Sequence, residues 1–137
     1  MSLNEKMKKE FEDFKSSNFS LEIWSGEKLV FRSKKKGLEG LLNFVEKHGR
    51  RLKHLIIFDK VIGNAAALLC VYLRAKEVYG IIGSKSAERT FRRFKIKYYF
   101  KKTRPNILNK LENDLCPFEK LSFKKAAKEF YSLLKNR

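Results

Sequence analysis

Hydrophobic and polar residues alternate along the chain with two different periods, and these periods predict helices and strands in turn. Apolar residues three or four positions apart near the start predict an amphipathic helix over about 3–16. Two short apolar runs, 21–24 and 29–32, flank a segment that contains a glycine, which indicates a β-hairpin. Helical spacing within 38–45 then predicts a second helix, with Gly49 as its C-cap.

The middle of the chain carries its most continuous apolar runs. Residues 55–58 form a run typical of a central strand covered on both faces, and we expect it to end at Asp59 and Lys60. A helix rich in small residues opens at Gly63, and small residues allow a helix to approach a sheet closely. A second buried strand follows over 78–82.

The last third predicts a basic helix over 87–94, an edge strand crowded by lysines over 96–100, and a C-terminal helix over about 122–136. Strands that alternate with helices indicate an α/β domain. We therefore predict that residues 1–137 form one domain, a three-layer α/β/α sandwich with a mixed five-stranded sheet. Clefts in open sheets of this kind lie beyond the carboxyl ends of the strands.

The charge of the chain narrows the list of partners only slightly. Lys and Arg number 32 against 15 acidic residues, which gives a net charge of +17. Such a field attracts nucleic acid, nucleotides, phosphorylated metabolites and acidic proteins. The same charge is as typical of a surface that keeps a protein soluble, and the absence of glutamine resembles a thermophile composition. Charge alone therefore assigns no function.

The hydropathy of the chain indicates where in the cell we expect the protein. No apolar run reaches the ~18 residues that a membrane span requires. The longest candidate, 65–73, is too short, and the charged N-terminal segment has no apolar signal core. We expect a cytoplasmic protein that does not contact a membrane.

The first candidate site follows the 55–58 strand. Asp59 would orient a ligand amine or hydroxyl, or act as a base, and Lys60, Gly63 and Asn64 would bind the ligand beside it. Ser84 ends the next strand and would lie at the same edge. The structural alternative is that Asp59 caps the loop and Asn64 caps the helix. The sequence leaves these two interpretations evenly balanced.

The second candidate site is the sequence Cys-Pro-Phe-Glu at 116–119. With proline at the first helical position, Cys116 would be the N-cap, where the helix dipole favours a nucleophilic or redox-active thiolate. The alternative is an ordinary helix start, in which Glu119 returns a hydrogen bond to the backbone. That alternative is the better account of Glu119, and both remain open for Cys116.

Zinc and other cofactors are not expected. The chain has two histidines and two cysteines, and no pair has the spacing of zinc ligands. A nucleic-acid-binding module is the alternative function, because Arg, Lys and aromatic residues interleave over 89–104. The sequence does not define the oligomeric state.

The run from Asp59 to Leu69, together with Cys116–Glu119 and the pair Asn109–Lys110, resembles the domain of unknown function 1893 family. This resemblance implies a prokaryotic protein with a cytidine-deaminase-like fold and no established activity. Zinc deaminases carry His-x-Glu and Pro-Cys-x-x-Cys motifs, and this chain has neither. We therefore expect a metal-free protein that binds a small anionic or nucleotide-like ligand in the cleft. Whether it is also an enzyme, with Asp59 and Cys116 as catalytic residues, stays open.

Overall fold

The computed structural model describes residues 5–105, 129, 131 and 132. In chain order its elements are α1 (Glu5–Ser16), β1 (Leu21–Ser25), β2 (Lys28–Ser33), α2 (Glu39–His48), β3 (Leu55–Ile62), α3 (Asn64–Tyr72), β4 (Glu77–Ser84), α4 (Lys85–Arg93) and β5 (Lys97–Arg104). Every helix and strand predicted between residues 5 and 105 is present.

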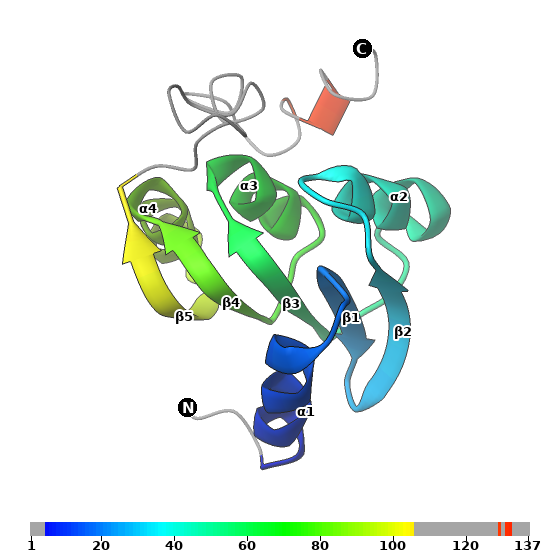
Figure 1. The fold of residues 1–137 in the computed structure, drawn as a ribbon. Helices are drawn as coiled ribbons and strands as arrows, with labels where there is room; N and C mark the ends of the chain where they lie inside the picture. Colours follow the sequence, from blue (N-terminus) through cyan, green and yellow to red (C-terminus); the bar gives the residue numbers. More distant parts are fainter. Residues whose placement is uncertain (1–4, 106–128, 130, 133–137) are drawn as a thin grey trace.

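The five strands form one mixed sheet in the order β2-β1-β3-β4-β5 (Figure 1). β1 is antiparallel to both of its neighbours, whereas β3, β4 and β5 are parallel to one another. The predicted hairpin and the predicted mixed five-stranded sheet are therefore confirmed. β5 is an edge strand among the described residues, as its lysines indicated.

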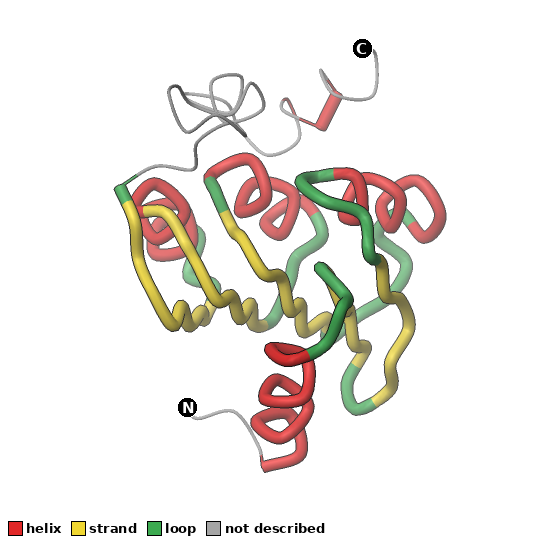
Figure 2. The backbone as a smooth tube through the Cα atoms, viewed as in Figure 1, coloured by secondary structure: helices red, strands yellow, loops and turns green. Residues whose placement is uncertain are grey.

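Helices cover both faces of the sheet, so the molecule has three layers (Figure 2). α1 lies against one face, and α2, α3 and α4 lie against the other (Figure 1). The alternation of side chains along β3 explains this arrangement. Leu55 and Ile57 belong to the core under the three helices, while Ile56 and Phe58 belong to the core under α1.

β3 is longer than predicted, and this changes where Asp59 and Lys60 lie. The strand continues to Ile62, because parallel pairing with β4 persists through Val61↔Ile82 and Ile62↔Gly83. The expected end at Asp59 and Lys60 is wrong because backbone pairing does not require apolar side chains. Both residues are part of the strand, and they point to opposite faces of the sheet.

The helix ends show one confirmed and one wrong prediction. Gly49 is the C-cap of α2 with φ +59°, a conformation that glycine adopts at no steric cost. Gly63 is the N-cap of α3, and Asn64 is its first helical residue, so the interpretation of Asn64 as the cap is wrong. Of the predicted C-terminal helix, the described residues 129, 131 and 132 are helical, and the ring of Tyr131 stacks on that of Tyr72 at 4.7 Å.

Gly83 in β4 lies directly under the ring of Phe100. A Cβ atom at Gly83 would approach that ring to 2.1 Å. We predict that Gly83→Ala destabilises the fold by about 1–3 kcal/mol, because Phe100 must leave its contacts with Phe91 and Tyr98. Urea denaturation measures this cost. In a Phe100→Ala background the added methyl should cost little, and equal costs in both backgrounds would contradict the proposed clash.

No helix in the described part of the chain is long and apolar enough to cross a membrane.

Candidate functional site

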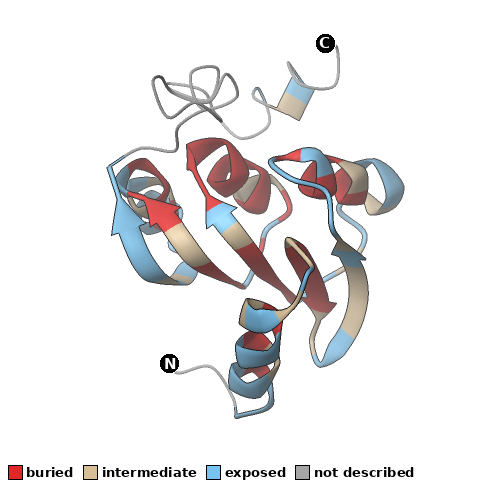
Figure 3. Cartoon of the chain, in the orientation of Figure 1, coloured by how far each residue is buried: buried red, intermediate tan, exposed pale blue. Residues whose placement is uncertain are grey.

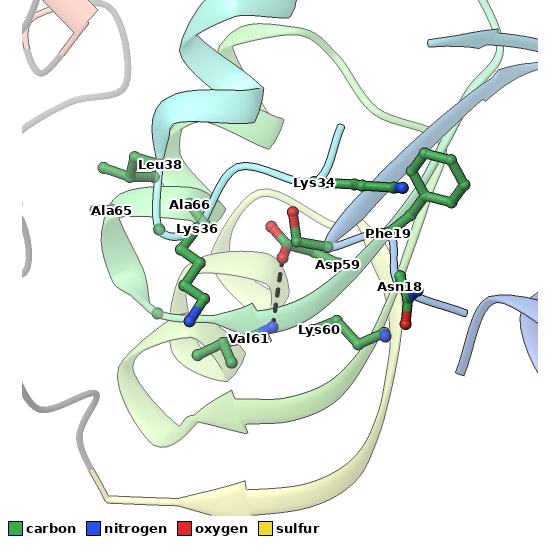
Figure 4. Close-up of a pocket in the computed structure, with 13 residues that line it drawn as sticks. Asn18, Phe19, Lys34, Lys36, Leu38, Asp59, Lys60, Val61, Ala65 and Ala66 are labelled. Atoms are coloured by element: carbon green, nitrogen blue, oxygen red, sulfur yellow. Dashed lines mark hydrogen bonds between the residues drawn. The ribbon is translucent and has the colours of Figure 1, made fainter. Parts of the chain in front are cut away.

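A cavity of about 410 Å³ opens at the carboxyl end of β3 (Figure 4). Four segments line it: the turn before β1, the loop between β2 and α2, the end of β3, and the first turn of α3. The lining residues are 18–20, 34, 36–38, 59–61, 63, 65 and 66. Its place beyond a parallel strand agrees with the general position of clefts in open α/β sheets.

Asp59 is the buried acid of this cavity. Its residue is 7% exposed, and strand alternation directs it to the face covered by α2, α3 and α4. The carboxylate oxygen Oδ1 accepts a hydrogen bond from the backbone N–H of Val61 at 3.3 Å (Figure 4). Burial raises the pKa of Asp59 to about 8, against the opposing effect of hydrogen bonds from Val61 and Lys60. The carboxyl is therefore mostly protonated and neutral at pH 7.

Cys70 on α3 is a buried neighbour of Asp59. Burial and the nearby Asp59 charge both raise the pKa of the thiol above its usual range. A protonated thiol is a poor nucleophile. Cys70 is thus a small core residue.

Lysines from the loop after β2 stand at the mouth of the cavity. Lys34 and Lys36 are both exposed, and the Lys34 ammonium lies 5.2 Å from the centre of the Phe19 ring. The guanidinium of Arg32 lies 4.4 Å from the same ring centre. Arg32 does not line the cavity, and its guanidinium forms an ion pair with Glu22 at 3.2 Å. Lys34 and Lys36 therefore make the entrance positive, while Asp59 in the cavity is mostly uncharged at pH 7.

Lys60 lines the cavity, but its ammonium is engaged on the opposite face of the sheet. The Nζ atom donates a hydrogen bond to the backbone oxygen of Ser17 at 2.7 Å. It also lies 5.1 Å from the centre of the Phe14 ring under α1. Lys60 therefore connects β3 to the end of α1, and its ammonium lies on the face of the sheet opposite the Asp59 carboxyl.

Asn64 and Ser84 have partners elsewhere. The Asn64 amide oxygen accepts a hydrogen bond from the Thr90 hydroxyl on α4, and Asn64 lines a smaller cavity of about 210 Å³ with Arg89 and Arg93. Ser84 is fully buried, and its Oγ accepts a hydrogen bond from the backbone N–H of Ala87 at 3.0 Å. Ser84 is thus the N-cap of α4 and does not line the Asp59 cavity.

The structure brings three predicted site residues, Asp59, Lys60 and Gly63, into one cavity. Cys116 and Glu119 lie outside the described residues. Sequence reasoning missed Lys34, Lys36 and the other walls from the loops beside β1 and β2. The basic run 34–36 before a glycine was visible, but no local pattern connects it to a strand two elements later.

Within residues 5–105 and the three described residues near the C-terminus, no group of three or more His, Cys, Asp or Glu side chains is placed to hold a metal ion.

The comparisons with known proteins identify the family. The model of the Domain of unknown function (DUF1893) family matches residues 9–137. The chain belongs to that family. A crystal structure of a DUF1893 family protein from Thermotoga maritima is 23% identical, covers 99% of this chain and 92% of its own, and superposes with a TM-score of 0.89. At this identity the likeness establishes the shared fold. No curated protein matches the chain.

Proposed function

We propose that this protein binds a small ligand with a planar polar group and an anionic group, such as a nucleotide, in the Asp59 cavity. The observation that carries the proposal is a buried carboxyl with a pKa of about 8 that lines a cavity with a positive entrance. A titratable group perturbed by burial inside a cleft is a recognised mark of functional sites.

The chemistry of a neutral carboxyl defines what it would recognise. Protonated Asp59 offers one O–H donor and one carbonyl acceptor side by side. Such a pair complements the donor–acceptor edge of a nucleobase or another amide-like heterocycle. Leu38, Val61 and the small side chains of Ala65 and Ala66 provide apolar walls for a flat ring.

The anionic part of the ligand would lie at the entrance. Lys34 and Lys36 are exposed there and can turn toward a phosphate group, although Lys34 would leave the Phe19 ring. The cavity volume of about 410 Å³ lies within the range of small-molecule sites.

Binding of common ribonucleoside monophosphates, measured by calorimetry, tests the proposal. We predict that Asp59→Ala weakens binding at least about tenfold, because an unpaired polar group on the ligand costs more than ~1 kcal/mol. Asp59→Asn should retain much of the affinity, since the amide also offers a donor and an acceptor. Asp13→Ala on the exposed face of α1 is the matched control. Equal affinities in the wild type, Asp59→Ala and the control would refute the proposed site.

Catalysis is a further hypothesis on the same cavity. With a pKa of about 8, Asp59 would serve as a proton donor at pH 7 and as a base only at higher pH. Cys116 as nucleophile and Glu119 as ligand-binding residue remain predictions of the sequence. The cytidine-deaminase-like fold and the cytoplasmic location also remain hypotheses from the sequence.

The alternative, a nucleic-acid interface over 89–104, does not correspond to one surface. Arg89, Arg92 and Arg93 are exposed on α4, which lies on the sheet face opposite α1. Residues of β5 alternate between that face and the face of α1. Any interface in this region must therefore use one of these two sides.

A further inference from the structure

Among the described elements, α1 covers only part of its face of the sheet. α1 packs on Trp24, Ile56, Phe58 and Tyr79, which belong to β1, β3 and β4. β5 lies beyond the helix at the edge of the described sheet and is largely exposed (Figures 1 and 3). A cavity of about 550 Å³ lies between α1 and β5, and it is the larger of the two main cavities described.

Tyr99 forms the exposed part of an aromatic cluster in this cavity. Its residue is 49% exposed, and its ring meets that of Phe11 edge-on, with centroids 6.2 Å apart. Tyr79 on β4 is the register partner of Tyr99, and the centroids of the two rings are 6.4 Å apart. Buried neighbours hold the Tyr99 ring in place while much of it stays open to solvent.

Positive charge surrounds this exposed ring. Lys8 and Lys97 line the cavity, and Lys8 also lies 3.7 Å from the carboxylate of the exposed Glu5. Lys101 lies two residues beyond Tyr99 on the same strand, so it projects from the same face. Glu12 is the acid among the described residues that line the cavity, and it forms an ion pair with Lys15 at 2.7 Å. The surface around Tyr99 is therefore cationic and aromatic together.

We propose that this surface, made of Lys8, Phe11, Tyr79, Lys97, Tyr99 and Lys101, binds single-stranded nucleic acid. A base would stack on the exposed part of Tyr99, and the lysines would contact the phosphates on either side. Aromatic platforms beside cationic grooves bind single strands with little sequence preference. The surface is separate from the Asp59 cavity, so the two proposals stand or fall independently.

Charge argues for a polyanion over a second copy of the chain. Pairing two β5 edges would bring Lys97, Lys101 and Lys102 close to the same residues of another molecule that also carries a charge of +17. Like charges opposite each other destabilise strand pairs, and lysine on an edge strand opposes such pairing. A single strand of nucleic acid would instead release counterions as it binds.

Fluorescence anisotropy with a labelled oligothymidylate of about 8 nucleotides tests the proposal. We predict that Tyr99→Ala weakens binding about tenfold, whereas Tyr99→Phe keeps most of the affinity because the stacking surface remains. Phe94→Ala is the matched control, since Phe94 is 42% exposed but follows α4 on the other face of the sheet. Replacing Lys97 or Lys101 with alanine should lower the slope of log affinity against log salt by about 0.7 for each phosphate that the lysine neutralises.

Three results would overturn the proposal. The first is the absence of salt-dependent binding by the wild-type chain. The second is an equal loss in Tyr99→Ala and Phe94→Ala, which would place binding elsewhere. The third is a dimer that Tyr99→Ala dissociates without any effect on oligonucleotide affinity, which would assign the surface to a second copy. Thermal unfolding of each variant checks that substitution of these exposed residues leaves the fold intact.

Discussion

Replacing Asp59 with asparagine should stabilise the protein, by an amount that grows as the pH rises from about 4 to about 8. The carboxyl of Asp59 has a pKa of about 8 in the folded state, against 3.8 as its ordinary value. In the unfolded chain it releases its proton near pH 4, whereas in the folded chain burial keeps the proton bound. The folded state therefore binds one more proton than the unfolded state across this interval.

The sign of the effect follows from proton linkage. Protonated Asp59 contributes its full stability below about pH 4, and that contribution is lost as the pH rises toward 8. Each pH unit in this window lowers the free energy of unfolding by about 1.4 kcal/mol, so the total loss approaches roughly 5 kcal/mol. Asparagine is close in shape to the neutral carboxyl and has no proton to lose, so it removes this dependence while keeping the hydrogen bond from Val61.

Urea denaturation of wild type and Asp59→Asn across pH 4–8 measures the difference. Among the described residues, Glu22 and His48 also contribute to the pH dependence, because burial raises the pKa of Glu22 and lowers that of His48. Both are present in wild type and variant, so their effects cancel in the difference. Asp13→Asn on the exposed side of α1 is the control and should give a curve parallel to wild type. A parallel curve for Asp59→Asn as well would show that Asp59 is ionised in the folded protein.

The order of the helices and strands could be predicted because a local sequence pattern indicates each of them. The hairpin needs a glycine-containing turn between two short runs, and α2 needs a stripe of leucines before Gly49. The lengths of β3 and β5 could not be predicted in the same way. β5 continues through Lys101 and Lys102 to Arg104 because β4 supplies hydrogen-bonding partners along its whole length, which is a tertiary effect.

The position of the Asp59 cavity could be predicted only from Asp59 itself. Asp59 follows an apolar run directly, so its position near a strand end could be inferred. Ser84 also follows an apolar run, but its Oγ accepts a hydrogen bond from the backbone N–H of Ala87, so Ser84 is the N-cap of α4. Lys34 and Lys36 belong to the cavity because β1 inserts between β2 and β3, and strand order is not encoded in local spacing.

The strands that α1 covers could not be predicted from local sequence patterns either. The stripe of Met7, Phe11 and Phe14 predicts that α1 is amphipathic, and all three residues are buried. The stripe does not say which strands the helix covers. Its partners are decided by the aromatic residues of the sheet, among which Phe58 contacts the rings of both Phe11 and Phe14 on α1.

Replacing Phe58 with alanine should destabilise the protein by about 3–5 kcal/mol, the range for a fully buried aromatic residue. The Phe58 ring lies 5.2 Å from Phe11 and 5.7 Å from Phe14 between centroids, so it joins the sheet to α1. Its other ring contacts are with Trp24 and Tyr79 on the two neighbouring strands. Its removal leaves a cavity between layers that the rigid sheet cannot close.

The loss should be concentrated in α1, and this distinguishes it from a general weakening of the core. Phe91 belongs to α4 and is equally buried on the other face of the sheet, so Phe91→Ala is the matched control. We expect similar losses in urea denaturation for both variants. Amide hydrogen exchange in α1 should become faster relative to the rest of the fold in Phe58→Ala only, because a helix of 12 residues is marginal without its packing. Equal acceleration of α1 in both variants would mean that α1 and the other three helices unfold as one unit.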